Sequence, residues 1–323
     1  MTDTDTVDTK PAPPSGRRFL FLLLKLALTA VVLYFVGRQV WHHWDSVETF
    51  NWQFNFWYLI PSILAAHVGL VLFAASWRRI ISGFGHHISV PMAYKIFNLS
   101  NLGRYIPGKV WQVFGMLYLA KKEGIPGEQA GASFVLFQLF TIPASLLVYV
   151  AAAQLEPSLL IDNFAIMGKN TAYLIGAIAL AGCAVLVFYP QPFLALANWG
   201  LKKVGRPAAT FVLDKRVALA AFAGYFLGWT SFGVAYWLFL KSILGDAAPT
   251  ALASIGLYNI AYQIGYLALF APGGLGPREL IMGELLKPFV GPLGPTLAVL
   301  ARLWSVLVDT SSALAALCIR KRS

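Results

Sequence analysis

The chain has 323 residues, of which 58% are apolar and only 12% are charged, and its formal net charge is +11. A soluble domain carries about a quarter charged residues, so this composition excludes a soluble protein and predicts an integral membrane protein. The basic residues stand beside apolar segments, so we expect contacts with anionic lipid head groups and none with nucleic acid. Cys183 and Cys318 lie far apart in apolar sequence, which predicts neither a disulfide nor a metal site.

The amino-terminal 18 residues differ from the rest, because they are rich in Thr, Asp and Pro and predict a disordered cytoplasmic tail. Residues 19–323 are expected to form a single transmembrane domain. A span needs about 20 apolar residues. Six stretches meet this requirement: Phe19–Trp41, Phe56–Trp77, Glu128–Leu155, Thr171–Tyr189, Lys215–Lys241 and Pro295–Ile319. No small-residue cleavage site follows the first stretch, so we interpret it as a span and not as a signal peptide.

Two further apolar stretches, Val90–Lys121 and Thr250–Lys287, are interrupted near their middle by Pro-Gly. In each, the sequence after the break is about half a span long. Such broken helices are tolerated at membrane depth where they line a cavity or are covered by protein. The predicted fold class is therefore an all-α polytopic membrane protein with about six full spans and two re-entrant broken-helix hairpins.

The charges support this topology, because it places most Lys and Arg residues on one side and leaves Lys169, Lys241 and Lys287 on the other. The positive-inside rule then predicts a multi-pass protein of the cytoplasmic (inner) membrane with both termini in the cytoplasm. Repeat-like units are expected at about 56–155 and 215–319. Three crossings separate the two hairpins, so the units would be inverted repeats, an architecture typical of alternating access.

Polar side chains gather around the first break, where the candidates for substrate binding are Asn98, Asn101, Arg104, Lys109 and Gln112. A helix begins at the break, and its unpaired N–H groups together with two cations suit a phosphate. The alternative is that Arg104 and Lys109 extend to the cytoplasmic head groups.

Around the second break, Gly273, Gly274 and Gly276 permit sharp bends and close approach of the backbone to a ligand. Arg278 and Glu279 follow directly and are candidates for substrate binding. The alternative is that Glu279 caps the next helix while Arg278 reaches outward.

In the last predicted span, Arg302 and Asp309 are seven residues apart and therefore share one helix face. Charges inside a membrane usually face the bundle interior, so both are candidates for substrate binding. The alternative is a structural ion pair that locks the bundle. Milder polar residues, Gln138, Asn259 and Gln263, are expected to hold helices together.

The sequence contains no nucleotide-binding fingerprint, Walker A loop, HExxH or GxSxG motif, so we expect no enzyme and no cofactor. The leading hypothesis is a translocator of an anionic phospholipid or a polyprenyl-phosphate-linked intermediate. A second is an accessory subunit that holds such a lipid for a glycosyltransferase without moving it. A third is an intramembrane enzyme that uses Glu279 and Asp309 as acid and base.

Two motifs, NLGRYIPGKVWQV from Asn101 to Val113 and PGGLGPREL from Pro272 to Leu280, resemble the flippase-like family named after the transmembrane region of lysylphosphatidylglycerol synthase. The resemblance implies a bacterial or archaeal membrane protein that moves lipids or lipid-linked intermediates between leaflets. It does not extend to the cytosolic aminoacyl-transfer domain, so lysyl transfer is not expected. The resemblance assigns motif roles to Arg104, Pro107, Gly108, Lys109, Trp111, Pro272, Gly273, Gly274, Gly276, Arg278, Glu279 and Arg302.

Overall fold

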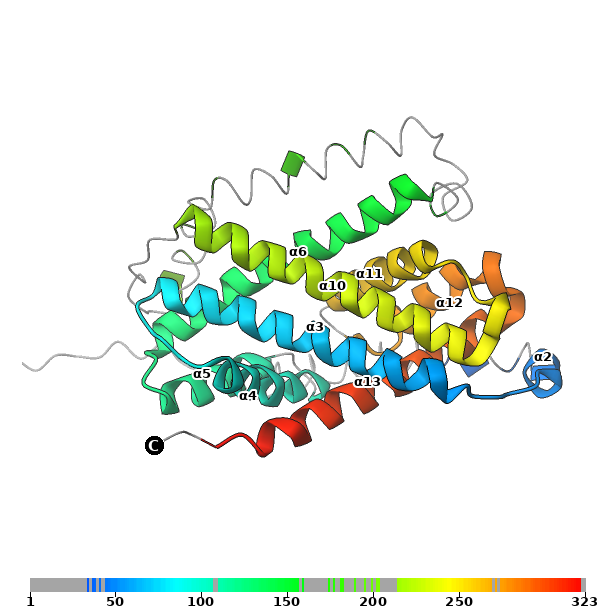
Figure 1. Cartoon of the computed structure of the whole chain (residues 1–323), viewed down its shortest axis with the longest axis horizontal. Helices are drawn as coiled ribbons and strands as arrows, with labels where there is room; N and C mark the ends of the chain where they lie inside the picture. The colour runs from blue at the N-terminus through cyan, green and yellow to red at the C-terminus, as the bar shows by residue number, and fades with distance from the viewer. Residues whose placement is uncertain are drawn as a thin grey trace, which may run out of the picture.

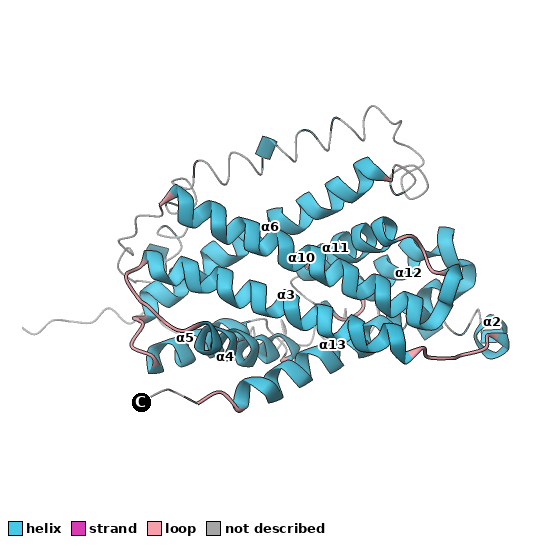
Figure 2. Cartoon of the chain, viewed as in Figure 1, coloured by secondary structure: helices cyan, strands magenta, loops and turns pink. Residues whose placement is uncertain are grey.

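The computed structural model describes residues 44–106, 110–156, 214–268 and 274–320, with single positions at 34, 37–38, 41, 159, 174, 177, 181–182, 189, 195, 199, 202–203 and 271. Throughout this part the regular structure is helical (Figure 2). The predicted tail and the predicted spans Phe19–Trp41 and Thr171–Tyr189 lie wholly or almost wholly outside it. The described elements are α2 (Trp44–Thr49), α3 (Phe56–Gly83), α4 (Val90–Asn101), η1 (Leu102–Tyr105), α5 (Val110–Lys122), α6 (Gly127–Leu155), α10 (Lys215–Leu244), η2 (Gly245–Ala247), α11 (Ala251–Leu267), α12 (Pro277–Val290), η4 (Gly291–Leu293) and α13 (Gly294–Leu317).

The protein is an all-α, multi-pass membrane protein. Four helical stretches are long and apolar enough to cross a bilayer, namely Phe56–Gly83, Gly127–Leu155, Lys215–Ala247 and Pro277–Leu317. They correspond to the predicted spans that lie within the described residues.

The last of these stretches is two helices and not one, because α12 and α13 fold back on each other at η4. A Cβ atom added at Gly283 of α12 would lie 3.0 Å from Cα of Pro295 in α13. Farther along the pair, Arg278 Nη2 donates to Ser305 Oγ. The residue numbers fall on one helix as they rise on the other, so the two run antiparallel, and α13 alone corresponds to the predicted span Pro295–Ile319.

Side-chain caps at the start of the helices explain where several elements begin. Asn55, Ser89, Asp214 and Thr250 each accept a hydrogen bond from a backbone N–H in the first turn that follows. These N–H groups have no partner within the helix, and small polar residues satisfy them best.

The centre of the bundle is the contact between α3 and α10, which lie side by side and run in opposite directions (Figure 1). Small residues let the helices approach closely: a Cβ at Gly69 would meet the Phe232 ring at 2.8 Å and the Gly228 carbonyl oxygen at 3.0 Å. Two hydroxyls bridge the pair, with Ser62 Oγ donating to the Ala235 carbonyl and Ser231 Oγ to that of Ala65, both at 2.7 Å. Close approach and interhelical hydrogen bonds are the main attractions between helices in lipid.

The order long helix, two short helices, long helix occurs twice, as α3–α4–α5–α6 and as α10–α11–α12–α13. Each helix of the first set has a counterpart at the same place in the second set, and counterparts make corresponding contacts. The pair α6 and α11 corresponds to α13 and α4, and the pair α3 and α10 corresponds to itself. In Figure 1 the hairpin α4–α5 opens toward the end of the bundle where α3 ends, and α11–α12 opens toward the opposite end. The two hairpins meet inside the bundle, where Arg104 of η1 contacts Tyr262 of α11.

Candidate functional site

The tip of the first hairpin is the short helix η1, which carries Arg104 and Tyr105 into the bundle. A Cβ at Gly103 would lie 2.6 Å from the backbone nitrogen of Gln112, so glycine lets η1 touch the start of α5. The Gln112 amide then donates from Nε2 to Asn101 Oδ1 at 2.8 Å, which ties the two arms together. The motif residues 107–109, including Lys109, lie outside the described part of the chain.

The second hairpin turns through glycines with positive φ, +72° at Gly274 and +91° at Gly276. A Cβ at Gly274 would lie 2.7 Å from the carbonyl oxygen of Gly265, so both conformation and space require glycine. The backbone N–H of Gly276 donates to Glu279 Oε2 at 2.6 Å, so Glu279 caps α12 with one of its oxygens. Pro272 and Gly273 lie outside the described residues.

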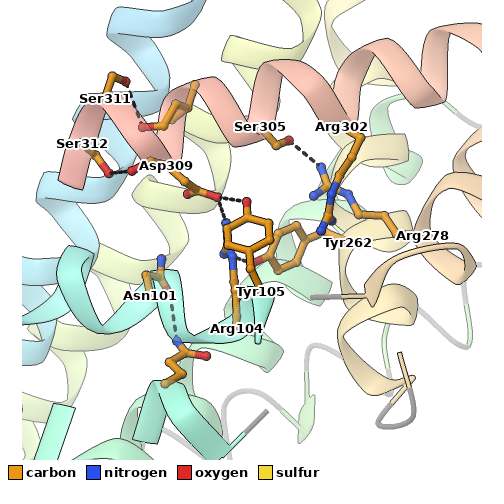
Figure 3. Close-up of polar contacts among 12 residues, drawn as sticks. Asn101, Arg104, Tyr105, Tyr262, Arg278, Arg302, Ser305, Asp309, Ser311 and Ser312 are labelled. Atoms are coloured by element: carbon orange, nitrogen blue, oxygen red, sulfur yellow. Dashed lines mark hydrogen bonds and ion pairs between the residues drawn. The ribbon is translucent and has the colours of Figure 1, made fainter. Parts of the chain in front are cut away.

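Asp309 of α13 connects the first hairpin to the last helix (Figure 3). Arg104 forms an ion pair through Nη2 with Asp309 Oδ2, and the Tyr105 hydroxyl donates to the same oxygen. The other terminal nitrogen of Arg104, Nη1, donates to the Tyr262 hydroxyl of α11 at 2.9 Å. The tip of the first hairpin is thus held by residues of both α11 and α13.

Two further arginines occupy the other half of this cluster. Arg278 lies over the Tyr262 ring, with 4.9 Å from its Cζ to the ring centroid, and its Nη2 is 3.1 Å from Ser305 Oγ. Arg302 Nη1 lies 3.6 Å from Glu279 Oε1. These contacts place three guanidinium groups from η1, α12 and α13 around one region of the interior.

The cluster is buried and carries an excess of positive charge. Arg278, Glu279 and Asp309 are each 5% exposed. Arg104, Arg278 and Arg302 against two carboxylates give 3 − 2 = +1 for the described part of the site. One negative charge would bring it to neutrality.

A cavity of about 50 Å³ adjoins the cluster. Its polar wall includes Arg104, Gln112, Gln263, Arg278 and Asp309, and its apolar wall is largely aromatic. The volume admits a few water molecules and no larger group.

The structure brings together most of the predicted binding residues that it describes. The cavity is lined by Asn101, Arg104, Gln112, Arg278 and Asp309. Glu279 and Arg302 pair with each other, and the Arg302 guanidinium lies over the Tyr105 ring. Arg104 and Arg278 turn inward, so the alternative in which they reach lipid head groups is not supported. Asp309 pairs with Arg104 of η1, and Arg302 pairs with Glu279 of α12; both are ion pairs between helices, of the kind that the structural alternative expects.

Two predicted residues lie apart from the cavity. Asn98 is 1% exposed, but its Nδ2 donates to the Tyr94 carbonyl one turn earlier, and the residue does not line the cavity. Trp111 is 50% exposed on α5 and packs beside Phe114, which suits an aromatic residue at a lipid-facing surface.

Four residues of the site were not among the predicted binding residues: Tyr105, Tyr258, Tyr262 and Ser305. The sequence could have indicated Ser305, because it lies three residues after Arg302 and four before Asp309 and therefore shares their helix face. Tyr105 lies within the first motif, but no periodic signal distinguishes Tyr258 and Tyr262 from other aromatic residues of the core.

The three polar residues predicted to hold helices together have different surroundings. Asn259 does hold helices together, because its Oδ1 accepts a hydrogen bond from Ser145 Oγ of α6 at 2.8 Å. Gln138 of α6 also joins two helices, because its side chain forms a hydrogen bond with Tyr266 of α11. Both Gln138 and Gln263 line the cavity.

The comparison with known families agrees with this architecture. The chain matches the family described as the lysylphosphatidylglycerol synthase TM region over residues 22–316, nearly its whole length. The protein therefore belongs to this family of membrane domains, as its two motifs predicted. No match is found among curated proteins.

Proposed function

We propose that the protein moves an anionic phospholipid or lipid-linked intermediate between the two leaflets of the cytoplasmic membrane. The observation that carries the proposal is the buried cluster of three arginines and two carboxylates at the meeting point of the two hairpins. Membership of a lipid-associated membrane family supports the class of substrate.

The energetics favour a binding role for this cluster over a purely structural one. A single Arg or Asp at the centre of a membrane helix costs about 2.5–3.5 kcal/mol on insertion scales. Ion pairs recover this only in part, and a well-packed apolar core is often at least as stable. Five ionised groups at one place are therefore better explained by an anionic ligand than by stability.

We further propose that both hairpins are re-entrant and that the two helix sets form inverted repeats about the site. The matched helix contacts and the opposite entry of the hairpins support this arrangement. Basic residues stand at the end of the bundle where α3 and α5 end and α10 begins; they are Arg78, Arg79, Lys121, Lys122, Lys215 and Arg216. The positive-inside rule predicts that this end faces the cytoplasm. Inverted repeats that meet at the midplane suit alternating access.

The substrate phosphate would take the place of Asp309 on Arg104 and would approach Arg278, while the acyl chains stay in lipid. Arg guanidinium groups bind phosphate with two parallel N–H bonds, which suits both residues. A cavity of about 50 Å³ is too small for a head group, so the hairpins must separate before it enters.

Lipid exchange in reconstituted vesicles tests the proposal. The protein is placed in liposomes with a fluorescent anionic phospholipid, and the fraction open to a membrane-impermeant quencher is followed over time. We expect exchange with the wild-type protein, and at least a tenfold lower rate with Arg278→Ala/Glu279→Gln, because both changes remove charge from the site. The control variant is Glu284→Gln, which alters an exposed ion pair with Lys287 on the same helix.

Each result has a defined reading. Equal rates for the wild type and the double variant would contradict the proposal. Binding of the lipid without exchange would favour an accessory subunit that presents lipid to a glycosyltransferase. Chemical turnover of the head group by the purified protein would favour an enzyme.

A further inference from the structure

Gln263 on α11 has surroundings that differ from those of the other buried amide on that helix. It is 2% exposed and lines the cavity beside the arginine cluster. Within the described part of the chain, neither its Oε1 nor its Nε2 has a hydrogen-bond partner. One turn earlier, Asn259 accepts from Ser145 Oγ and donates to the Ile255 carbonyl at 2.9 Å. A buried amide without partners is costly and calls for a ligand or water at that place.

Gln263 lies next to the arginine cluster that we propose binds the phosphate. It directly follows Tyr262, whose hydroxyl accepts from Arg104 and whose ring lies under Arg278. A second amide, that of Gln138 on α6, lines the same cavity. The cavity therefore combines cations that suit a phosphate with neutral groups that both donate and accept hydrogen bonds.

The chemistry of these groups discriminates between lipid head groups. A hydroxyl donates one hydrogen bond and accepts others, and a carboxamide offers both partners. An ammonium head group can only donate and would add a positive charge beside an excess of arginine. A head group without hydroxyls would leave the amide unpaired.

We propose that Gln263 recognises hydroxyl groups next to the phosphate, so the substrate is an anionic lipid whose head group is a polyol or a sugar. This inference rests on the proposed function, because it names the substrate class of the same site. One net hydrogen bond predicts a preference of roughly tenfold for the hydroxyl-bearing lipid.

Two lipids that differ only in their hydroxyl groups test this inference. Phosphatidylglycerol and phosphatidylpropanol with identical acyl chains are both singly charged phosphodiesters with a three-carbon head group, but only the first has free hydroxyls. The measured quantity is the ratio of their exchange rates in the reconstituted wild-type protein, which we expect to be roughly ten. With Gln263→Leu the ratio should fall to about one, because leucine has similar volume and no hydrogen-bonding atoms. With Arg278→Ala both rates should fall while the ratio persists.

The control variant is Asn259→Leu, which removes an amide of the same helix that bonds only within the protein. It should lower the midpoint of thermal unfolding and leave the ratio near ten. A wild-type ratio of one, or a ratio unchanged by Gln263→Leu, would overturn the inference.

A separate measurement keeps the inference distinct from the proposed function. If neither lipid exchanges between leaflets, the proposed transport function is wrong. Recognition of the head group is then tested by mass spectrometry, with the two lipids competing for the purified protein. Preferential binding of phosphatidylglycerol that is lost in Gln263→Leu supports hydroxyl recognition. Equal binding of the two lipids overturns it.

Discussion

The ion pair between Arg104 and Asp309 shows how single residues hold the charged cluster together. Its side chains are 18% and 6% exposed, and the Tyr105 hydroxyl shares the same carboxylate oxygen. Loss of one partner would leave the other charge buried without compensation, which is far more costly than loss of both. Double-mutant analysis can therefore separate the value of the pair from the penalty for an orphaned charge.

For this pair we predict strong non-additivity. Asp309→Ala should lower the free energy of unfolding by about 3–5 kcal/mol because Arg104 loses its counter-ion. Arg104→Ala/Asp309→Ala should lose clearly less than the sum of the two single variants, as measured by equilibrium unfolding in mixed micelles. Glu284→Ala, at an exposed ion pair, should change stability by less than about 1 kcal/mol. Additive losses at the buried pair would show that the two residues are not coupled.

At the scale of elements, the hairpins close because glycines stand where backbones touch. Gly103 contacts the first turn of α5, and Gly265 faces Arg278, whose Cα would be 3.0 Å from an added Cβ. Neither contact can be relieved by moving the end of a flexible side chain. The hairpin geometry, and with it the position of the arginines, therefore depends on these glycines.

This dependence predicts opposite outcomes for two glycine substitutions. Gly103→Ala should destabilise the protein by about 1–3 kcal/mol, because its methyl group would meet the backbone of Trp111 and Gln112. Gly131→Ala should be neutral or slightly stabilising, since that position lies within α6 and an added Cβ would meet only the Leu117 side chain at 3.7 Å. Thermal unfolding of the two purified variants gives the comparison, and a stable Gly103→Ala protein would show that η1 does not need this close approach.

At the scale of the molecule, the two hairpins open toward opposite ends of the bundle and meet at the charged cluster, where Tyr262 of α11 contacts both Arg104 and Arg278. Residues at the open ends of the hairpins should then face opposite sides of the membrane. Lys121 lies in the last turn of α5, and Ala247 ends η2, four residues before α11 begins; both are exposed.

Labelling of single cysteines tests this topology. The background is Cys183→Ser/Cys318→Ser, because Cys318 is an exposed thiol. We expect a membrane-impermeant maleimide to label Ala247→Cys in intact cells and Lys121→Cys only after permeabilisation. Reaction of both positions from the same side would contradict the inverted arrangement.

The sequence by itself determined the helical membrane class, four of the apolar stretches, and the interruption of two more between α4 and α5 and between α11 and α12. It could do so because hydropathy and helix breakers act over a few turns of chain. It also indicated the charged residues, since ionised groups in apolar sequence are conspicuous wherever the helices pack. Only the tertiary structure decided that Arg104 pairs with Asp309, 205 positions away. It also separated Asn259 from Gln263, two buried amides one turn apart on one helix, of which one bonds within the protein and the other lines the cavity. The local sequence pattern cannot predict the partner of a buried polar group, because that partner depends on which helices pack against it.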